Sequence, residues 1–356
     1  MNPTQALHDL GQSLWLDNLT RTMIADGTLA RYIREFAVTG LTSNPTIFVA
    51  AIRNGFCYDK AIRGKSAHGK SGEALFFELA IEDLTRAADL FRPVFDASHG
   101  IDGWVSLEVS PLLADDTEAT VRSALDLHAR AQRPNFYIKI PGTAAGIAAI
   151  EEAVFAGVPI NVTLLFSREQ YLAAAEAWLR GVERRLDARL DAAVSSVASL
   201  FVSRWDAAVK DRVPADLRNR LGIAVGQSCY QVYREQLVSP RWRRVIEAGA
   251  PPQRLLFAST GTKDNAARDT LYVEALAAPD TVNTLPEKTL LAFADHGSTS
   301  GVLAADGGDH AATLAAFAQA GVDIAALATK LQEDGTQAFV KSWRELLGCI
   351  ADKAGD

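Results

Sequence analysis

The sequence predicts an α/β fold: a (β/α)8 barrel of the TIM type, with extra helices after strand 2 and at the C-terminus. Two observations predict it. Eight short runs rich in β-branched and apolar residues recur along the chain, and segments with helical spacing of apolar residues separate them. Strands that alternate with helices pair in parallel, and eight such units can close into a ring. An open doubly wound sheet would more often carry a glycine-rich nucleotide turn after its first strand, and no G-x-G-x-x-G is found there.

The strands are expected at regular intervals along the chain. Their ranges are residues 13–17, 38–42, 104–109, 136–140, 160–165, 194–201, 255–259 and 281–285. Between them lie helical patterns such as 143–156, where Ile147, Ile150 and Val154 recur at helical spacing and Gly157 is placed to end the helix.

Two stretches exceed what a plain barrel needs. Residues 45–103 read as several helices, and residues 286–356 read as a helical extension. We interpret both as additions to a single barrel domain that spans residues 1–356, with its strands within about 13–285.

The composition indicates a chain that can bury a large core. Apolar residues make up 48% and charged residues 22%. The chain has 36 Lys and Arg against 43 Asp and Glu, a formal charge of -7, which argues against an extended nucleic-acid surface but allows a local basic pocket.

The same sequence carries few signs of a secreted, membrane or metal-binding protein. Cys57, Cys229 and Cys349 lack the paired spacings of zinc and redox sites. Residues 1–20 show no signal pattern, and no apolar run is long enough to cross a bilayer. We therefore expect a cytoplasmic protein with no membrane or nucleic-acid partner, either a monomer or a homodimer.

Polar side chains alternate with apolar ones on three successive expected strands. Successive side chains of a strand point to opposite faces, so the polar positions of each strand share a face. These positions are Ser106 and Glu108, Tyr137 and Lys139, and Asn161 and Thr163. We expect them inside the barrel near the C-terminal ends of the strands, where barrel enzymes build their active sites.

Other strands add polar residues at the same end: Asp17, Asn44, Ser199 and Ser259. Burial of an amine in such a place disfavours its charged form and frees the lone pair that attacks a carbonyl. Lys139 is therefore a candidate for forming a Schiff base.

Eight stretches, in order along the chain, resemble transaldolase in its longer bacterial form. They are LWLDNL (14–19), TSNPTIF (42–48), SLEVSP (106–111), IKIPGT (138–143), NVTLLFS (161–167), SLFVSR (199–204), ASTGTK (258–263) and DTVNTLPEKT (280–289). Each is a weak signal alone, but eight in order are specific. The resemblance implies that sedoheptulose 7-phosphate donates a dihydroxyacetone unit to glyceraldehyde 3-phosphate, giving erythrose 4-phosphate and fructose 6-phosphate in the pentose phosphate pathway. It implies no metal and no organic cofactor.

The resemblance also implies catalytic roles for four residues. Lys139 would form the Schiff base with the ketose, and Asp17 would take the hydroxyl proton during cleavage. Glu108 and Thr163 would hold a water between them and move protons while the imine forms and hydrolyses.

The implied substrate-binding residues lie in the same motifs. Asn44 and Asn161 would hold hydroxyls of the ketol unit, with help from Ser199, and the set is completed by Thr42, Phe201, Arg204, Ser259 and Lys263. Arg204, Ser259 and Lys263 are assigned to the phosphate. Phe201 stands where related fructose 6-phosphate aldolases carry a tyrosine, and an apolar ring there favours transfer over release.

Local sequence also allows simpler roles. A strand lysine is usually exposed at a sheet edge, and Glu108 could only pair with Lys139. Asp17 and Asn44 read as helix N-caps, and residues 260–264 as a turn that starts a helix.

Two other functions stay open besides transfer. One is a lyase resembling fructose 6-phosphate aldolase, which releases dihydroxyacetone to water. The other is a catalytically silent barrel that acts as a binding module.

Overall fold

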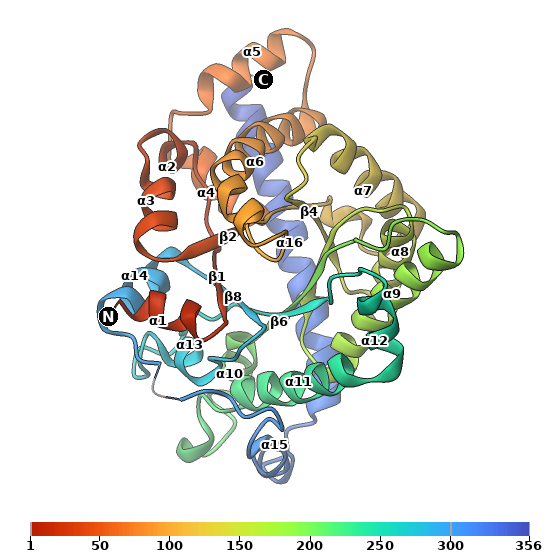
Figure 1. Ribbon diagram of the computed structural model, residues 1–356. Helices are drawn as coiled ribbons and strands as arrows, with labels where there is room; N and C mark the ends of the chain where they lie inside the picture. The colour runs from red at the N-terminus through yellow and green to blue at the C-terminus, as the bar shows by residue number, and fades with distance from the viewer. Residues whose placement is uncertain (1, 300, 356) are drawn as a thin grey trace.

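The computed structural model describes residues 2–299 and 301–355 and contains a closed barrel of eight parallel strands in chain order (Figure 1). The strands are β1 (Ser13–Leu16), β2 (Val38–Thr42), β3 (Val105–Glu108), β4 (Phe136–Pro141), β5 (Ile160–Leu165), β6 (Ser196–Phe201), β7 (Arg254–Ala258) and β8 (Val282–Leu285). β8 pairs with β1, with Ser13 opposite Val282, and this pairing closes the ring. The predicted fold class is confirmed, and every expected strand overlaps the observed one.

Helices surround the ring. Those that belong to the barrel repeat or precede its first strand are α1 (Pro3–Asp9), α2 (Arg21–Ala25), α3 (Thr28–Glu35), α7 (Thr117–Ala131), α8 (Ala144–Phe155), α9 (Arg168–Asp187), α10 (Ser203–Val209), α11 (Leu221–Val238), α12 (Pro240–Glu247), α13 (Leu271–Ala275) and α14 (Glu287–His296). Two short 3-10 helices are Pro111–Leu113 and Ala215–Leu217. α8 is the helix expected at 143–156: Thr143 caps its first turn by accepting from the Gly146 N–H, and Gly157 follows it with a φ of +92°.

The two expected helical additions are present. After β2 come α4 (Pro45–Arg53), α5 (Asp59–Ala67) and α6 (Gly72–Ala97), and the chain ends with α15 (His310–Gln319) and α16 (Ile324–Ala354). Within the described residues, no single helix is long and apolar enough to span a membrane. α15 and α16 meet that test only as a pair, and this pair is bent by 91°.

The long helix α16 crosses the C-terminal end of the barrel, behind the strands in the view of Figure 1. The buried face of α16 repeats every three or four residues, as expected of an amphipathic helix. This face consists of Ala328, Leu331, Gly335, Phe339, Trp343, Leu346 and Ile350. The Gln332 amide fastens the helix by donating to the carbonyls of Gly142 and Leu164, each at 2.9 Å, just beyond β4 and within β5.

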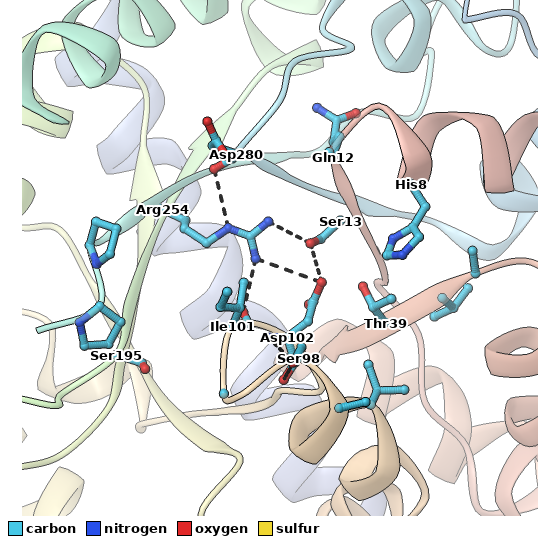
Figure 2. A pocket seen from close by; sticks show the side chains of 18 of the residues that line it. His8, Gln12, Ser13, Thr39, Ser98, Ile101, Asp102, Ser195, Arg254 and Asp280 are labelled. Atoms are coloured by element: carbon cyan, nitrogen blue, oxygen red, sulfur yellow. Dashed lines mark hydrogen bonds and ion pairs between the residues drawn. The ribbon is translucent and has the colours of Figure 1, made fainter. Parts of the chain in front are cut away.

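A buried polar network lies at the opposite end of the barrel, beside a cavity of about 990 Å³ (Figure 2). Arg254 donates to the Ser13 hydroxyl at 2.7 Å and to the Thr281 carbonyl at 2.8 Å. Asp102 accepts from Trp15 Nε1 at 2.7 Å and from the Ser13 hydroxyl, and its Oδ2 lies 4.0 Å from Arg254 Nη1. These polar groups satisfy one another, so the network ties the starts of β1 and β7 to the loop before β3.

The Trp15 ring fits inside the barrel because the neighbouring strand carries a glycine. A Cβ added at Gly40 would lie 2.6 Å from Trp15 Nε1, closer than carbon and nitrogen atoms can approach. The pairing of Gly40 with Trp15 in the β1–β2 register therefore places the indole where Asp102 can accept from it.

We expect Asp102→Ala to lower the free energy of unfolding by ~1–3 kcal/mol, because the substitution removes the acceptor of a buried indole N–H and leaves that donor unsatisfied. The substitution leaves Trp15 Nε1 without its acceptor and Arg254 without its nearest carboxylate. Urea denaturation measures the loss. The matched control is Asp126→Ala, which removes an exposed carboxylate paired with Arg130 and should change stability little. Equal stability of the two variants would contradict a supporting role for the network.

Candidate active site

A cavity of about 390 Å³ opens at the C-terminal end of the barrel and collects most of the predicted site residues. Its lining includes Asp17, Thr42, Asn44, Lys139, Thr163, Ser199, Phe201, Arg204, Ser259 and Lys263. The other two predicted residues, Glu108 and Asn161, do not line it but contact residues that do. The barrel thus brings together side chains from seven of its strands, β1 to β7, and the segments that follow them.

Lys139 lies on β4 and points into the barrel, as the alternation of its strand predicts. The residue is 4% exposed. Its Nζ lies 3.5 Å from Glu108 Oε2 and donates to the Ser43 carbonyl at 3.2 Å. The β3–β4 register sets Glu108 directly opposite Lys139, so the pairing of the strands itself creates this contact. The exposed-edge interpretation of this lysine is therefore wrong, whereas the ion pair with Glu108 is present.

Glu108 is held where its charge is costly. Burial raises the pKa of its carboxyl to about 7, and the charge of Lys139 partly opposes that rise. Near neutral pH the group can therefore either give or take a proton. Glu108 Oε2 and Thr163 Oγ1 are both buried, and neither has a hydrogen-bond partner among the residues that the structure describes.

The backbone of β5 is distorted next to Thr163. Leu164 has a φ of +58°, which is uncommon for a residue with a branched side chain, and the β5–β6 register shifts between Val162 and Leu165. Such irregularities re-aim side chains and are frequent beside active sites.

Asp17 follows β1 and shares the cavity with Lys139. Its Oδ1 accepts from the Thr42 hydroxyl at 2.8 Å and from Asn44 Nδ2 at 3.5 Å. Burial raises the pKa of Asp17, and the nearby charge of Lys139 opposes the rise. Asp17 is not a helix N-cap: the cap of α2 is Thr20, whose side chain accepts from the Met23 N–H.

Asn44 is the predicted helix N-cap and also lines the cavity. Its side-chain oxygen caps α4 by accepting from the Ile47 N–H at 3.1 Å, while its amide nitrogen faces Asp17. A capping residue at a strand end can thus contribute to the cavity, because the cap uses only one side of the amide.

Asn161 is fully buried beneath the cavity. Its oxygen accepts from the Ser199 hydroxyl at 2.7 Å, and its nitrogen donates to the Ser106 hydroxyl at 3.1 Å. In this arrangement the amide orients Ser199, which lines the cavity.

Two cations stand at the cavity without a carboxylate within salt-bridge distance in the described part of the chain: Arg204 and Lys263. The Arg204 guanidinium lies over the Phe201 ring, 5.0 Å from its centroid, and burial lowers the pKa of Arg204. Ser259 lines the same cavity, with a φ of +54° and a hydroxyl 3.0 Å from that of Ser203. Residues 260–264 begin no helix, since α13 starts at Leu271, so that simpler interpretation is wrong.

Several lining residues were not predicted: Asn18, Thr46, Ile47, Ala50, Ala258, Gly261, Thr284, Pro286 and Phe339. The position of Asn18 directly after Asp17 could have predicted that it lines the cavity. Its amide donates to Glu287 at 2.9 Å, and Tyr32 donates to the same carboxylate at 2.7 Å. Phe339 comes from α16, for which strand alternation gives no information.

Comparison with known proteins gives consistent matches over nearly the whole chain. The family described as Transaldolase/Fructose-6-phosphate aldolase matches residues 14–350. A transaldolase of Arthrobacter sp. (strain FB24) is 44% identical over 357 residues, which cover 98% of this chain and 96% of that protein. A transaldolase of Thermobifida fusca (strain YX) is 43% identical, with 99% and 98% covered, and transaldolase 1 of Streptomyces coelicolor is 43% identical, with 97% and 93% covered.

Proposed function

The chain belongs to the Transaldolase/Fructose-6-phosphate aldolase family and has the transferase function of a transaldolase, and from this premise we propose that Lys139 is its Schiff-base amine. The supporting observation is the enclosure of Lys139 Nζ, 3.5 Å from a carboxyl group whose pKa is about 7. The reaction carries a dihydroxyacetone unit from sedoheptulose 7-phosphate to glyceraldehyde 3-phosphate, as part of carbohydrate metabolism. It needs an amine, acid–base groups and a place for phosphate.

In the proposed mechanism the Lys139 amine attacks the ketose carbonyl to give a carbinolamine. Glu108 then donates the proton with which the carbinolamine hydroxyl leaves as water, and an iminium ion remains. A water held between Glu108 and Thr163 would carry this proton. The two buried oxygens without partners among the described residues support that role.

Asp17 would act in the carbon–carbon step. It takes the proton of the hydroxyl next to the bond that breaks, and the bonding electrons move into the iminium ion to form an enamine. The acceptor aldehyde then regains a proton from Asp17 when the enamine attacks it. The raised pKa of Asp17 supports this role, since it makes the carboxylate a stronger base.

Arg204, Lys263 and Ser259 would bind the phosphate of the sugar, while Thr42, Asn44 and Ser199 would contact its hydroxyls. A phosphate dianion needs fixed donors and cations, and two cations without carboxylate partners in the described chain suit that need. Asn161 is assigned to orienting Ser199.

Phe201 supports transfer over release of dihydroxyacetone. It lines the cavity with an apolar ring that offers no proton to the enamine. The proposal further includes a single-domain, cytoplasmic enzyme, either monomer or homodimer. Its three cysteines are unpaired, as expected in a reducing compartment.

Borohydride reduction in the presence of fructose 6-phosphate should attach the three-carbon unit covalently to the peptide that carries Lys139. Peptide mass mapping locates the adduct. Lys139→Ala should give none, whereas Lys263→Ala should keep the adduct on Lys139 once enough sugar is supplied. An adduct on another lysine, or one that persists in Lys139→Ala, would refute the assignment.

The rate of Schiff-base formation should fall as the pH rises through about 7. Glu108 is protonated below this pKa and can donate; above it the donor is lost. Borohydride quenching at successive times measures the rate. Glu108→Gln should form the Schiff base more slowly and without this pH dependence, while the exposed Glu118→Gln should keep it. A pH profile that is unchanged in Glu108→Gln would exclude Glu108 as the donor.

Arg204→Ala should reduce kcat/KM for fructose 6-phosphate by roughly 10- to 100-fold, the effect of losing a charged hydrogen bond of ~1.5–3 kcal/mol. Unphosphorylated fructose should react about as well with the variant as with the parent enzyme. The exposed Arg243→Ala, on the outer helix α12, serves as the control. An equal loss of kcat/KM with both sugars would show that Arg204 does not bind the phosphate.

A further inference from the structure

We propose that Phe339, on the C-terminal helix α16, determines whether the enzyme transfers the ketol unit or releases it. The ring would keep water and proton donors away from the enamine on Lys139. This inference rests on the function and the Schiff-base amine proposed above, and adds a specificity-determining residue from outside the barrel strands and their loops.

Phe339 is the part of α16 that reaches the reaction cavity. It lines the same cavity as Lys139, is 5% exposed, and its ring centroid lies 5.9 Å from Lys139 Nζ. The rest of the described lining comes from barrel strands, from the segments that follow them and from α4 and α10. The amine therefore faces Glu108 on one side and an aromatic ring on another.

Contacts on both sides of Phe339 fix its position. Before it, Gln332 binds the carbonyls of Gly142 and Leu164. After it, the Ser342 hydroxyl lies 2.9 Å from that of Thr46, and Trp343 donates to Glu73 at 2.7 Å. The helix can therefore hold the ring in place over the amine through a catalytic cycle.

A glycine one turn before the ring lies close to two side chains, one from β5 and one from α10. A Cβ at Gly335 would lie 2.9 Å from Leu164 Cδ2 and 3.1 Å from Arg204 Nη1. Gly335 thus lets α16 lie against β5 and beside the proposed phosphate ligand, and Phe339 follows four residues later on the same face.

The enamine has two possible fates. It can attack an acceptor aldehyde, which completes transfer. Alternatively its carbon can take a proton from water or a nearby acid, after which water adds to the iminium carbon and dihydroxyacetone leaves, with the Lys139 amine restored. The second route consumes one water molecule and needs a proton donor at the carbon.

Phe339 opposes the second route in two ways. Its side chain has no exchangeable proton, and it occupies space that water would otherwise fill beside the amine. Phe201 lines the same cavity, so the two rings would act from different elements of the fold.

The test compares release with transfer for the same Schiff base. The enzyme is incubated with fructose 6-phosphate, with and without erythrose 4-phosphate, and formation of glyceraldehyde 3-phosphate is followed. The parent enzyme should form close to one equivalent per active site when the acceptor is absent. Phe339→Ala should continue to turn over and raise the ratio of release to transfer by about tenfold, a difference of ~1.4 kcal/mol between the two barriers.

Two further variants separate this role from simple packing. Phe339→Leu keeps part of the apolar volume and should give a ratio between those of the parent and Phe339→Ala; if the alanine variant does not fold, the leucine variant must still exceed the parent. Leu346→Ala removes a fully buried residue of the same helix that does not line the cavity, and it should leave the ratio unchanged.

The outcomes distinguish a failure of this inference from a failure of the proposed function on which it rests. Without a borohydride adduct on Lys139 in the parent enzyme, the proposed mechanism itself fails. If the adduct forms and transfer is normal, but Phe339→Ala and Phe339→Leu keep the parent ratio, only the role of Phe339 is wrong. An equal rise in Leu346→Ala would also overturn it, because the effect would then come from general loosening of α16.

Discussion

The chemistry proposed for this barrel depends on the contact between Lys139 and Glu108. Parallel pairing of β3 with β4 sets the two side chains opposite one another, and the closed sheet removes both from water. Burial of a charged carboxylate or ammonium group costs free energy, and a nearby group of opposite charge offsets part of that cost. At 3.5 Å the pair stabilises itself only in part, since the pKa of Glu108 is still raised to about 7. The proton can thus move at neutral pH, as imine chemistry requires.

The polarity of the cavity changes from floor to rim. Glu108 and Asn161 are buried beneath the cavity. Asp17 accepts hydrogen bonds from Thr42 and Asn44. The cations Arg204 and Lys263 line the cavity and are more exposed than the two buried groups. In the proposed mechanism, the sugar carbonyl would face Lys139 and the phosphate would bind Arg204 and Lys263, which line the same cavity. The charge pattern alone would therefore favour one orientation of the substrate.

Recurring β-branched and apolar runs were enough to predict the strands, and period-two alternation predicted the inward-facing residues, because a closed sheet leaves each side chain only two directions. Strand alternation cannot predict which residues outside the strands line the cavity. Phe339 belongs to a helix whose buried face could pack on many surfaces, and only the tertiary contacts of Gln332 and Gly335 select the barrel mouth. The sequence also could not show that Asn161 is engaged by Ser106 and Ser199, since these bonds join three strands whose relative height depends on the barrel's stagger.

Some buried polar atoms lack hydrogen-bond partners at each end of the barrel among the described residues: Gln12 Oε1 and Gln253 Oε1 just before β1 and β7, and Thr163 Oγ1 on β5. Where the strands begin, Asp102, Arg254, Ser13 and Trp15 satisfy one another. Where they end, Thr163 Oγ1 lacks a hydrogen-bond partner within the described residues and Glu108 Oε2 has only its ion pair with Lys139, while Leu164 and Ser259 have left-handed backbone conformations. Each unsatisfied buried group costs ~1–3 kcal/mol, and each strained residue a similar amount. The closed network at the far end, with the tightly packed α16 across the mouth, supplies rigidity that holds the reactive groups in place.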